Sequence, residues 1–126
     1  MNPLDVQVGG QHYKKYKIQP VELYNKFCLG FGESNLIKYS MRHQDKNGLQ
    51  DLDKVDHYCD LMIQFNKPVG DFMSFDYIEH FAHVNNLSSF AKQVIEEVSL
   101  WLLNGSSDHL QSVKSLIREE RSKYKP

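Results

Sequence analysis

Long hydrophobic runs are missing from this 126-residue chain, and no window approaches the ~18 apolar residues of a membrane-spanning helix. The N-terminal MNPLDVQVGG also lacks the basic and apolar regions of a secretory signal peptide. Hydrophobic residues make up 40% of the chain and charged residues 25%, as in ordinary globular proteins. We therefore expect a cytoplasmic protein with no membrane association.

The chain also lacks an excess of charge of either sign. It carries 15 Lys and Arg against 16 Asp and Glu, a formal net charge of −1. Such a balance gives no global attraction to a polyanion, which disfavours general nucleic-acid binding, so any anion site must come from local clustering. A chain of this length fits one domain, residues 1–126.

Cysteine is scarce, and the common catalytic and metal-binding motifs are absent. Cys28 and Cys59 each have apolar neighbours, which predicts reduced core thiols, and they lie too far apart in the sequence for a zinc knuckle. No glycine-rich phosphate loop, H-E-x-x-H motif or serine nucleophile elbow occurs. If the chain binds a phosphorylated ligand, side chains would have to make most of the contacts. We expect no resident metal or cofactor, although Mg²⁺ can accompany a nucleotide.

Helical spacing of apolar residues predicts an all-α fold, a small helical bundle with an extended N-terminal arm. The arm covers residues 1–19, a helix-turn-helix core covers 20–65, and additional helices fill 66–126. Gly30 is expected to stop the first helix and Ser34 to cap the second. The predicted helices are 20–29, 35–45, 49–65, 72–84, 87–103 and 107–123.

The C-terminal helices carry broad apolar faces that fit either the core or contacts between subunits. For the Trp101 region we favour the core. The final REERSKYK is expected to be a solvated, salt-bridged helix end. We also expect a homo-oligomer, because a short chain has little room to enclose a nucleotide alone. The apolar residues are Phe90, Val94, Ile95, Val98, Trp101, Leu102, Leu110, Val113 and Ile117.

One polar stripe on the second predicted helix has the composition of a phosphate-binding surface. At 100° per residue it falls within an arc of about 100°. Its members are Asn35, Lys38, Tyr39, Arg42 and Lys46. Glu33 lies just before this stripe and has three possible roles. It stabilises the helix N-terminus through the helix dipole, orients Arg42 or Lys38, or accepts a hydrogen bond from a base or ribose. A plain exposed charged face is the alternative for the whole stripe.

Two polar edges flank the apolar side of the predicted 49–65 helix. The acidic edge can hold Mg²⁺ or simply face solvent, and we favour the solvated face. Antiparallel packing across the turn at 46–48 would bring the second edge, which contains Asp51, Lys54 and Tyr58, beside Lys38 and Arg42. The acidic edge contains Asp53, Asp56 and Asp60, and the other contains Asp51, Lys54 and Tyr58.

The N-terminal arm contains the cluster His12-Tyr13-Lys14, which supplies a hydrogen-bond donor, a stacking ring and a positive charge. The preceding Gly9-Gly10 would let the backbone approach a ligand closely. A solvated tail whose tyrosines pack on the body is the alternative.

These motifs together resemble a bacteriophage family of small proteins that is catalogued as a domain of unknown function and often labelled nucleotide kinase or SaV-like. The family pattern runs Gly-Gly-x-His-Tyr-Lys, Ile-Gln-Pro, Glu-Gly-Asn-x-x-Lys-Tyr-x-x-Arg, Lys-x-Gly-x-x-Asp-Leu-x-Lys and a final Tyr. Ser34 stands where the family usually has Gly, and the resemblance ends near Phe65. The matching residues are Gly9, Gly10, His12, Tyr13, Lys14, Ile18, Gln19, Pro20, Glu33, Asn35, Lys38, Tyr39, Arg42, Lys46, Gly48, Asp51, Leu52, Lys54 and Tyr58.

The resemblance implies that these polar residues bind a phosphorylated nucleotide, most concretely in a nucleoside monophosphate kinase. Such an enzyme must neutralise the transferring phosphoryl group, which would fall to Lys38, Arg42 and Lys46. His12 or Asp51 would then accept the proton of the attacking hydroxyl.

Base stacking would fall to Tyr13 or Tyr39. One alternative is a non-catalytic sponge that sequesters a host immune-signalling nucleotide, an anti-defence role that needs charge and stacking groups but no acid–base pair. A weaker alternative is a helical interaction scaffold.

Overall fold

The computed structural model describes residues 2–5, 15–44 and 47–124. Within these ranges it contains six α-helices and no β-strand, which confirms the predicted all-α bundle. None of these helices is long and apolar enough to cross a membrane. The elements are η1 (Pro3–Asp5), α1 (Pro20–Lys26), α2 (Phe31–Arg42), α3 (Leu49–Phe65), α4 (Phe75–Val84), α5 (Ser89–Asn104), α6 (Asp108–Arg121) and η2 (Ser122–Tyr124).

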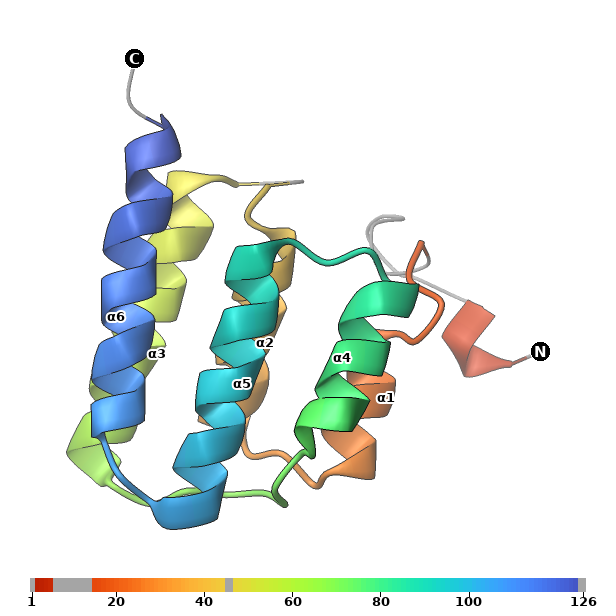
Figure 1. Ribbon diagram of the computed structural model, residues 1–126, viewed down its shortest axis with the longest axis horizontal. Helices are drawn as coiled ribbons and strands as arrows, with labels where there is room; N and C mark the ends of the chain where they lie inside the picture. Colours follow the sequence, from red (N-terminus) through yellow and green to blue (C-terminus); the bar gives the residue numbers. More distant parts are fainter. Residues whose placement is uncertain (1, 6–14, 45–46, 125–126) are drawn as a thin grey trace.

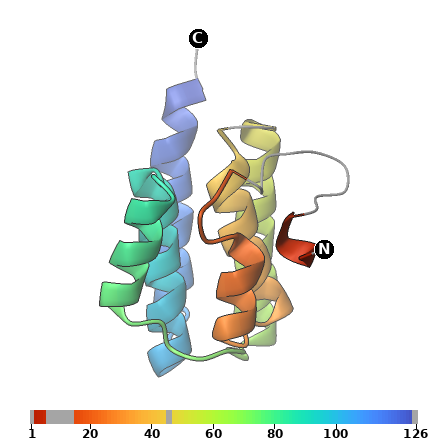
Figure 2. The same ribbon diagram turned by 90° about the vertical axis from the view of Figure 1, so that its right-hand side faces the viewer.

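The six α-helices form two layers (Figure 1). Helices α6, α5 and α4 make one layer, and α3, α2 and α1 lie behind them in the same order. Turning the molecule by 90° separates the two layers (Figure 2). The segment 66–74 crosses one end of the bundle and connects the back layer to the front one.

The core lies between the layers and is built largely from α5. Val94, Ile95, Val98 and Trp101 are completely buried, so the apolar face of α5 belongs to the core, as favoured from the sequence. Leu110, Val113 and Ile117 of α6 are buried as well. Full burial of each such side chain contributes about 1.5–3 kcal/mol, and these faces therefore hold the front layer onto the α2–α3 pair.

The predicted boundary between the first two helices is wrong. Helix α1 ends at Lys26, and Gly30 is the N-cap of α2, so Ser34 lies inside that helix. The Gly30 carbonyl accepts from the Ser34 N–H at 2.9 Å, and the Gly30 N–H donates to the Val69 carbonyl at 2.8 Å. The contact with Val69, 39 positions later, fixes where α2 begins and is invisible to local sequence patterns.

Helices α4 and α5 begin later than predicted because serine side chains cap them. The Ser74 hydroxyl accepts from the Tyr77 N–H, and the Ser88 hydroxyl accepts from the Ala91 N–H, both at 3.1 Å. A hydroxyl in this position satisfies a backbone donor of the first turn. Each helix therefore starts at the residue after its serine.

The two cysteines are free, as predicted, but only one is in the core. Cys59 is completely buried, and burial raises the pKa of its thiol to about 12. Cys28 is exposed in the turn between α1 and α2, where its φ is 53°. The prediction of a core thiol is therefore confirmed for Cys59 and wrong for Cys28.

The acidic edge of α3 is a solvated face, as favoured from the sequence, because the side chains of Asp53, Asp56 and Asp60 are exposed by 63%, 38% and 61%. It also forms ion pairs with α6, which the sequence did not predict. Lys114 of α6 donates to Asp56 at 2.8 Å and to Asp60 at 2.7 Å, and Arg121 pairs with Asp53. Burial lowers the pKa of Lys114, but its hydrogen bonds to the two aspartates outweigh this and raise it. In the described part of the chain, no group of three His, Cys, Asp or Glu side chains could hold a metal ion.

Candidate functional site

The turn between α2 and α3 sets the geometry of the candidate site. Gly48 lies in this turn with a φ of 50°, a conformation that favours glycine. The turn returns the chain antiparallel to α2 and brings Asp51, in the first turn of α3, opposite Arg42. The distance from Arg42 Nε to Asp51 Oδ2 is 3.3 Å. The predicted meeting of the acidic and basic edges is thus confirmed for this pair.

Asp51 is enclosed, although it lies in the first turn of a helix at the bundle edge. Its side chain is 0% exposed, Oδ2 also accepts from the Asn47 N–H at 3.4 Å, and Oδ1 is 3.8 Å from Lys54 Nζ. A buried carboxylate between two cations fixes where those cations lie. Asp51 therefore positions Arg42 and Lys54.

Three cations gather around the ring of Tyr39. Lys54 Nζ lies 4.7 Å from the ring centroid, Arg42 Cζ 5.0 Å and Lys38 Nζ 5.2 Å. All three distances are within the range of cation–π attraction, about 6 Å. We call Lys38, Arg42 and Lys54 the cation cluster.

A row of aromatic rings extends from the cation cluster along the α2–α3 pair. Tyr39 stacks on Tyr58 at 6.2 Å with the planes 9° apart, and Tyr58 meets the edge of Phe31 at 5.7 Å. We call Phe31, Tyr58 and Tyr39 the aromatic row. Phe31 was not predicted as a site residue, although its spacing of seven and eight from Lys38 and Tyr39 places it on the same side of α2.

The electrostatics of this surface favour an anion. Lys38 makes no ion pair among the described residues, whereas Arg42 and Lys54 are both placed by Asp51. The Lys54 side chain is 36% exposed and that of Arg42 is 11% exposed. Ammonium and guanidinium groups are strong donors to phosphate oxygens. The cluster therefore offers oriented donors to a phosphate that approaches from solvent.

Glu33 lies with the core and away from the cations. It is 3% exposed, and its Oε2 accepts from the Trp101 Nε1–H at 3.0 Å and from the Val69 N–H at 2.9 Å. It pairs with neither Lys38 nor Arg42 in the described structure. Asn35 donates to the carbonyl of Phe31, one turn earlier in the same helix, at 2.8 Å.

Four predicted site residues, His12, Tyr13, Lys14 and Lys46, lie outside the described residues. The structure thus brings together Lys38, Tyr39, Arg42, Asp51, Lys54 and Tyr58. It gives Glu33 and Asn35 partners within the fold.

A second polar cluster lies at the same end of the bundle. His43 is 1% exposed, with Nδ1 2.7 Å from the Tyr124 hydroxyl and Nε2 3.1 Å from Glu120 Oε2. Burial raises the pKa of Tyr124, and the charges of Glu120 and Asp51 raise it further. Because Glu120 is 3% exposed, the prediction of a solvated C-terminal helix end is wrong at this residue.

Tyr124 packs η2 against the α2–α3 turn, where its ring faces Gly48.

Comparison with known proteins agrees with the sequence resemblance in part. No curated protein and no solved structure matches the chain. Residues 8–60, which include α1, α2 and most of α3, match the model of a family described as a protein of unknown function (DUF3310).

Proposed function

We propose that this protein binds a phosphorylated nucleotide on the α2–α3 surface, with the phosphates on the cation cluster. The observation that supports the proposal is the placement of three cations within 5.2 Å of a single tyrosine ring. Folding brings Lys54 to Tyr39 from the neighbouring helix, and the buried Asp51 orients two of the cations. A surface selected only for solubility does not need a buried counter-ion beneath it.

Sequestration of the nucleotide stands ahead of phosphoryl transfer in this proposal. A nucleoside monophosphate kinase needs an acceptor for the proton of the attacking hydroxyl. Asp51 was one of two candidates, but its carboxylate is 0% exposed and lies between Arg42 and Lys54. The other candidate, His12, lies outside the described residues. Mg²⁺ would enter, if at all, with the phosphates of the nucleotide.

The proposal predicts that Lys38→Ala and Lys54→Ala each weaken nucleotide binding about tenfold, since a charge-assisted hydrogen bond contributes about 1.5 kcal/mol or more. Titration calorimetry with nucleoside mono-, di- and triphosphates and with cyclic dinucleotides measures this. Lys26→Ala is the matched control, because Lys26 lies 5.5 Å from the ring of Tyr77 on a different helix and should be silent.

If no nucleotide raises the melting temperature of the wild-type protein at saturation, the proposal is wrong and the scaffold alternative takes its place. The ligand recovered after denaturing the complex then separates the two nucleotide functions. Unaltered nucleotide supports sequestration, and new phosphorylated products reveal a kinase.

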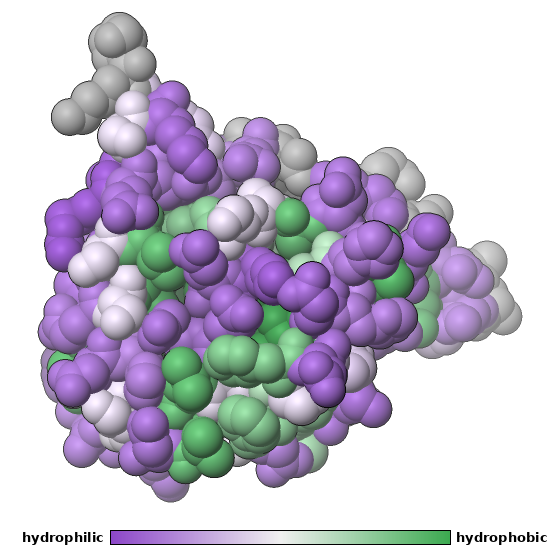
Figure 3. Space-filling model, in the orientation of Figure 1, coloured by the Kyte–Doolittle hydropathy of each residue, from purple (hydrophilic) through white to green (hydrophobic). Residues whose placement is uncertain are grey.

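The proposal extends to self-association. The face in Figure 3 carries an apolar patch formed by α4, α5 and the segment before them, with Phe72, Phe75 and Leu103 exposed by 42%, 44% and 60%. Such patches mark contact surfaces on many proteins. We expect sedimentation to give a homo-oligomer that Phe75→Lys dissociates, whereas Val21→Lys, on exposed α1, does not. A monomeric wild-type protein at high concentration would exclude this part of the proposal.

A further inference from the structure

The end of the α2–α3 pair opposite the turn contains a cavity that the phosphate site does not use. Its volume is about 340 Å³, and its wall is mainly apolar. It is formed by the start of α2, the end of α3 and the first residues of the crossing segment. The residues that matter for its shape are Phe31, Gly32, Tyr58, Met62, Phe65 and Val69.

Close approach of the two helices forms the floor of this cavity. A Cβ atom on Gly32 would lie 2.7 Å from Met62 Cγ, so a larger residue at this position would have to displace the Met62 side chain. Val69 closes one side, held there by the hydrogen bond from its N–H to Glu33. The backbone positions of α2, α3 and the crossing segment therefore define one part of the cavity, and exposed side chains complete its rim.

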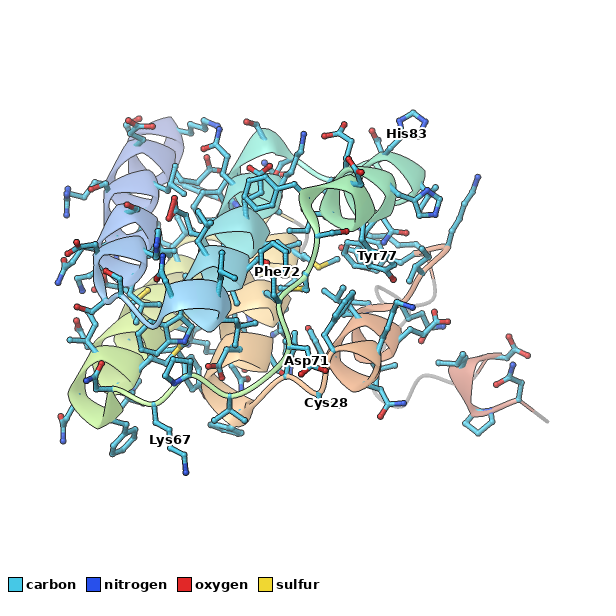
Figure 4. All side chains as sticks on the ribbon, turned by 60° about the horizontal axis from the view of Figure 1, so that its bottom comes forward. Cys28, Lys67, Asp71, Phe72, Tyr77 and His83 are labelled. Carbon is cyan, nitrogen blue, oxygen red and sulfur yellow. The ribbon has the colours of Figure 1, made fainter. Side chains whose placement is uncertain are left out.

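Two phenylalanines at the rim are unusually exposed. Phe31 is 76% exposed and Phe65 is 69% exposed, the largest values among the exposed large apolar side chains of the described chain. Both rings line the same apolar cavity, and aromatic side chains are the groups on which other flat rings stack. Lys67 extends away from the bundle just beyond α3 (Figure 4), and it also lines the cavity. A planar, polar-edged ring fits these surroundings better than an aliphatic chain.

The cavity and the cation cluster belong to one continuous surface. Phe31 contacts Tyr58, and Tyr58 stacks on Tyr39. The cation cluster lies around the ring of Tyr39. Seven helical residues separate Phe31 from Lys38, a rise of about 10 Å along the axis of α2. An extended nucleotide has the same order of parts, with the base at one end and the phosphates at the other.

From this continuity we infer that the Phe31–Phe65 cavity is the base subsite of the nucleotide whose phosphates lie on the cation cluster, an inference that rests on the proposed function. It assigns the base to Phe31 and Phe65 and not to Tyr39. One neighbour of Tyr39 is the parallel ring of Tyr58, and its surroundings are otherwise occupied by the three cations. The protein should therefore discriminate a nucleotide from a bare polyphosphate.

The test compares dATP and dTTP with inorganic tripolyphosphate, which has the phosphates but no base. Base stacking on an aromatic side chain is sequence-tolerant and strong enough to be measured by alanine substitution. We expect the wild-type protein to bind the nucleotides at least tenfold more tightly than tripolyphosphate. Phe31→Ala and Phe65→Ala should each remove most of this difference and leave tripolyphosphate binding unchanged.

Two variants control for other effects. Phe31→Trp keeps a stacking ring and should retain nucleotide affinity, whereas Val21→Ala trims an exposed apolar side chain on α1 and should be silent. Both phenylalanines are exposed, so circular dichroism should show an unchanged fold.

Equal binding of nucleotide and tripolyphosphate would overturn the base subsite and leave the phosphate site standing. Nucleotide affinity that is insensitive to both phenylalanine substitutions would overturn the base subsite as well. If neither compound binds, the proposed function itself is wrong and the base subsite falls with it.

Discussion

Asp51→Asn should destabilise the fold by about 3 kcal/mol, the loss typical when one partner of a buried ion pair is removed. The asparagine is nearly the same size, so the change removes a charge without opening a cavity. Arg42 would lose a carboxylate at 3.3 Å and Lys54 one at 3.8 Å, in a position that is 0% exposed. For a chain of this length the melting temperature should fall by roughly 10 °C.

Asp53→Asn provides the matched control for this prediction. It is the same substitution two residues along the same helix, but the Asp53 side chain is 63% exposed and its partner Arg121 is 36% exposed. An exposed pair of this kind contributes no more than about 1 kcal/mol. Urea unfolding of the two variants measures the difference, and equal stability would show that Asp51 is not a buried counter-ion.

The same variant also separates two roles of Asp51 in ligand binding. As a positioning residue it holds Arg42 and Lys54, so Asp51→Asn should weaken phosphate binding at temperatures where the variant is folded. As a proton acceptor it would leave binding intact and abolish turnover. Calorimetry beside a phosphate-exchange assay distinguishes these results, and we expect the first.

Much of the α2–α3 pair could be predicted because its determinants are local. The apolar residues of α2 repeat at helical spacing, and Leu36 and Ile37 are indeed completely buried. The short turn with Gly48 then makes the two helices antiparallel, which places Arg42 opposite Asp51. Periodicity and turn length together were enough to predict this contact.

The roles that could not be predicted depend on distant parts of the chain. The acidic edge of α3 is exposed as predicted, but its ion pairs were not foreseen because Lys114, which pairs with Asp56 and Asp60, is more than fifty residues away. The buried pair of His43 and Glu120 likewise joins α6 to the end of α2. Periodicity shows that such residues share a face but not which element covers that face.

The exposed phenylalanines show a different limit. A sequence pattern assigns aromatic residues to the core by default, and Phe31 lies four residues before the first member of the predicted polar stripe. Only the structure shows that Phe31 and Phe65 remain exposed beside a common cavity. The proposed base contacts are therefore the residues for which the hydrophobic pattern was least informative.

Glu33→Ala should lower the free energy of unfolding by about 4 kcal/mol, the largest effect among the substitutions proposed here, because Glu33 is buried against the core. Its Oε2 accepts from the indole of Trp101 and from the N–H of Val69, 68 and 36 residues away. Hydrogen bonds to a charged group contribute about 1.5–3 kcal/mol each, and their removal leaves the buried indole N–H of Trp101 and the N–H of Val69 without this partner. Chemical unfolding measures the loss, and Glu79→Ala is the control because that side chain is 66% exposed.

Glu33→Gln distinguishes a structural glutamate from a ligand-binding one. The glutamine keeps a carbonyl oxygen that can accept from Trp101 and Val69, so it should recover more than half of the stability lost by the alanine variant. Trp101 is the only tryptophan, and its emission should shift in Glu33→Ala but remain close to that of the wild type in Glu33→Gln. Nucleotide affinity should follow the same order, because Glu33 holds Val69 in the wall of the base cavity. The contrary result would be a Glu33→Gln variant that keeps full stability and loses all nucleotide binding. In that case the Glu33 carboxylate would contact the ligand directly, and its hydrogen bond to Trp101 would exist only in the unbound protein.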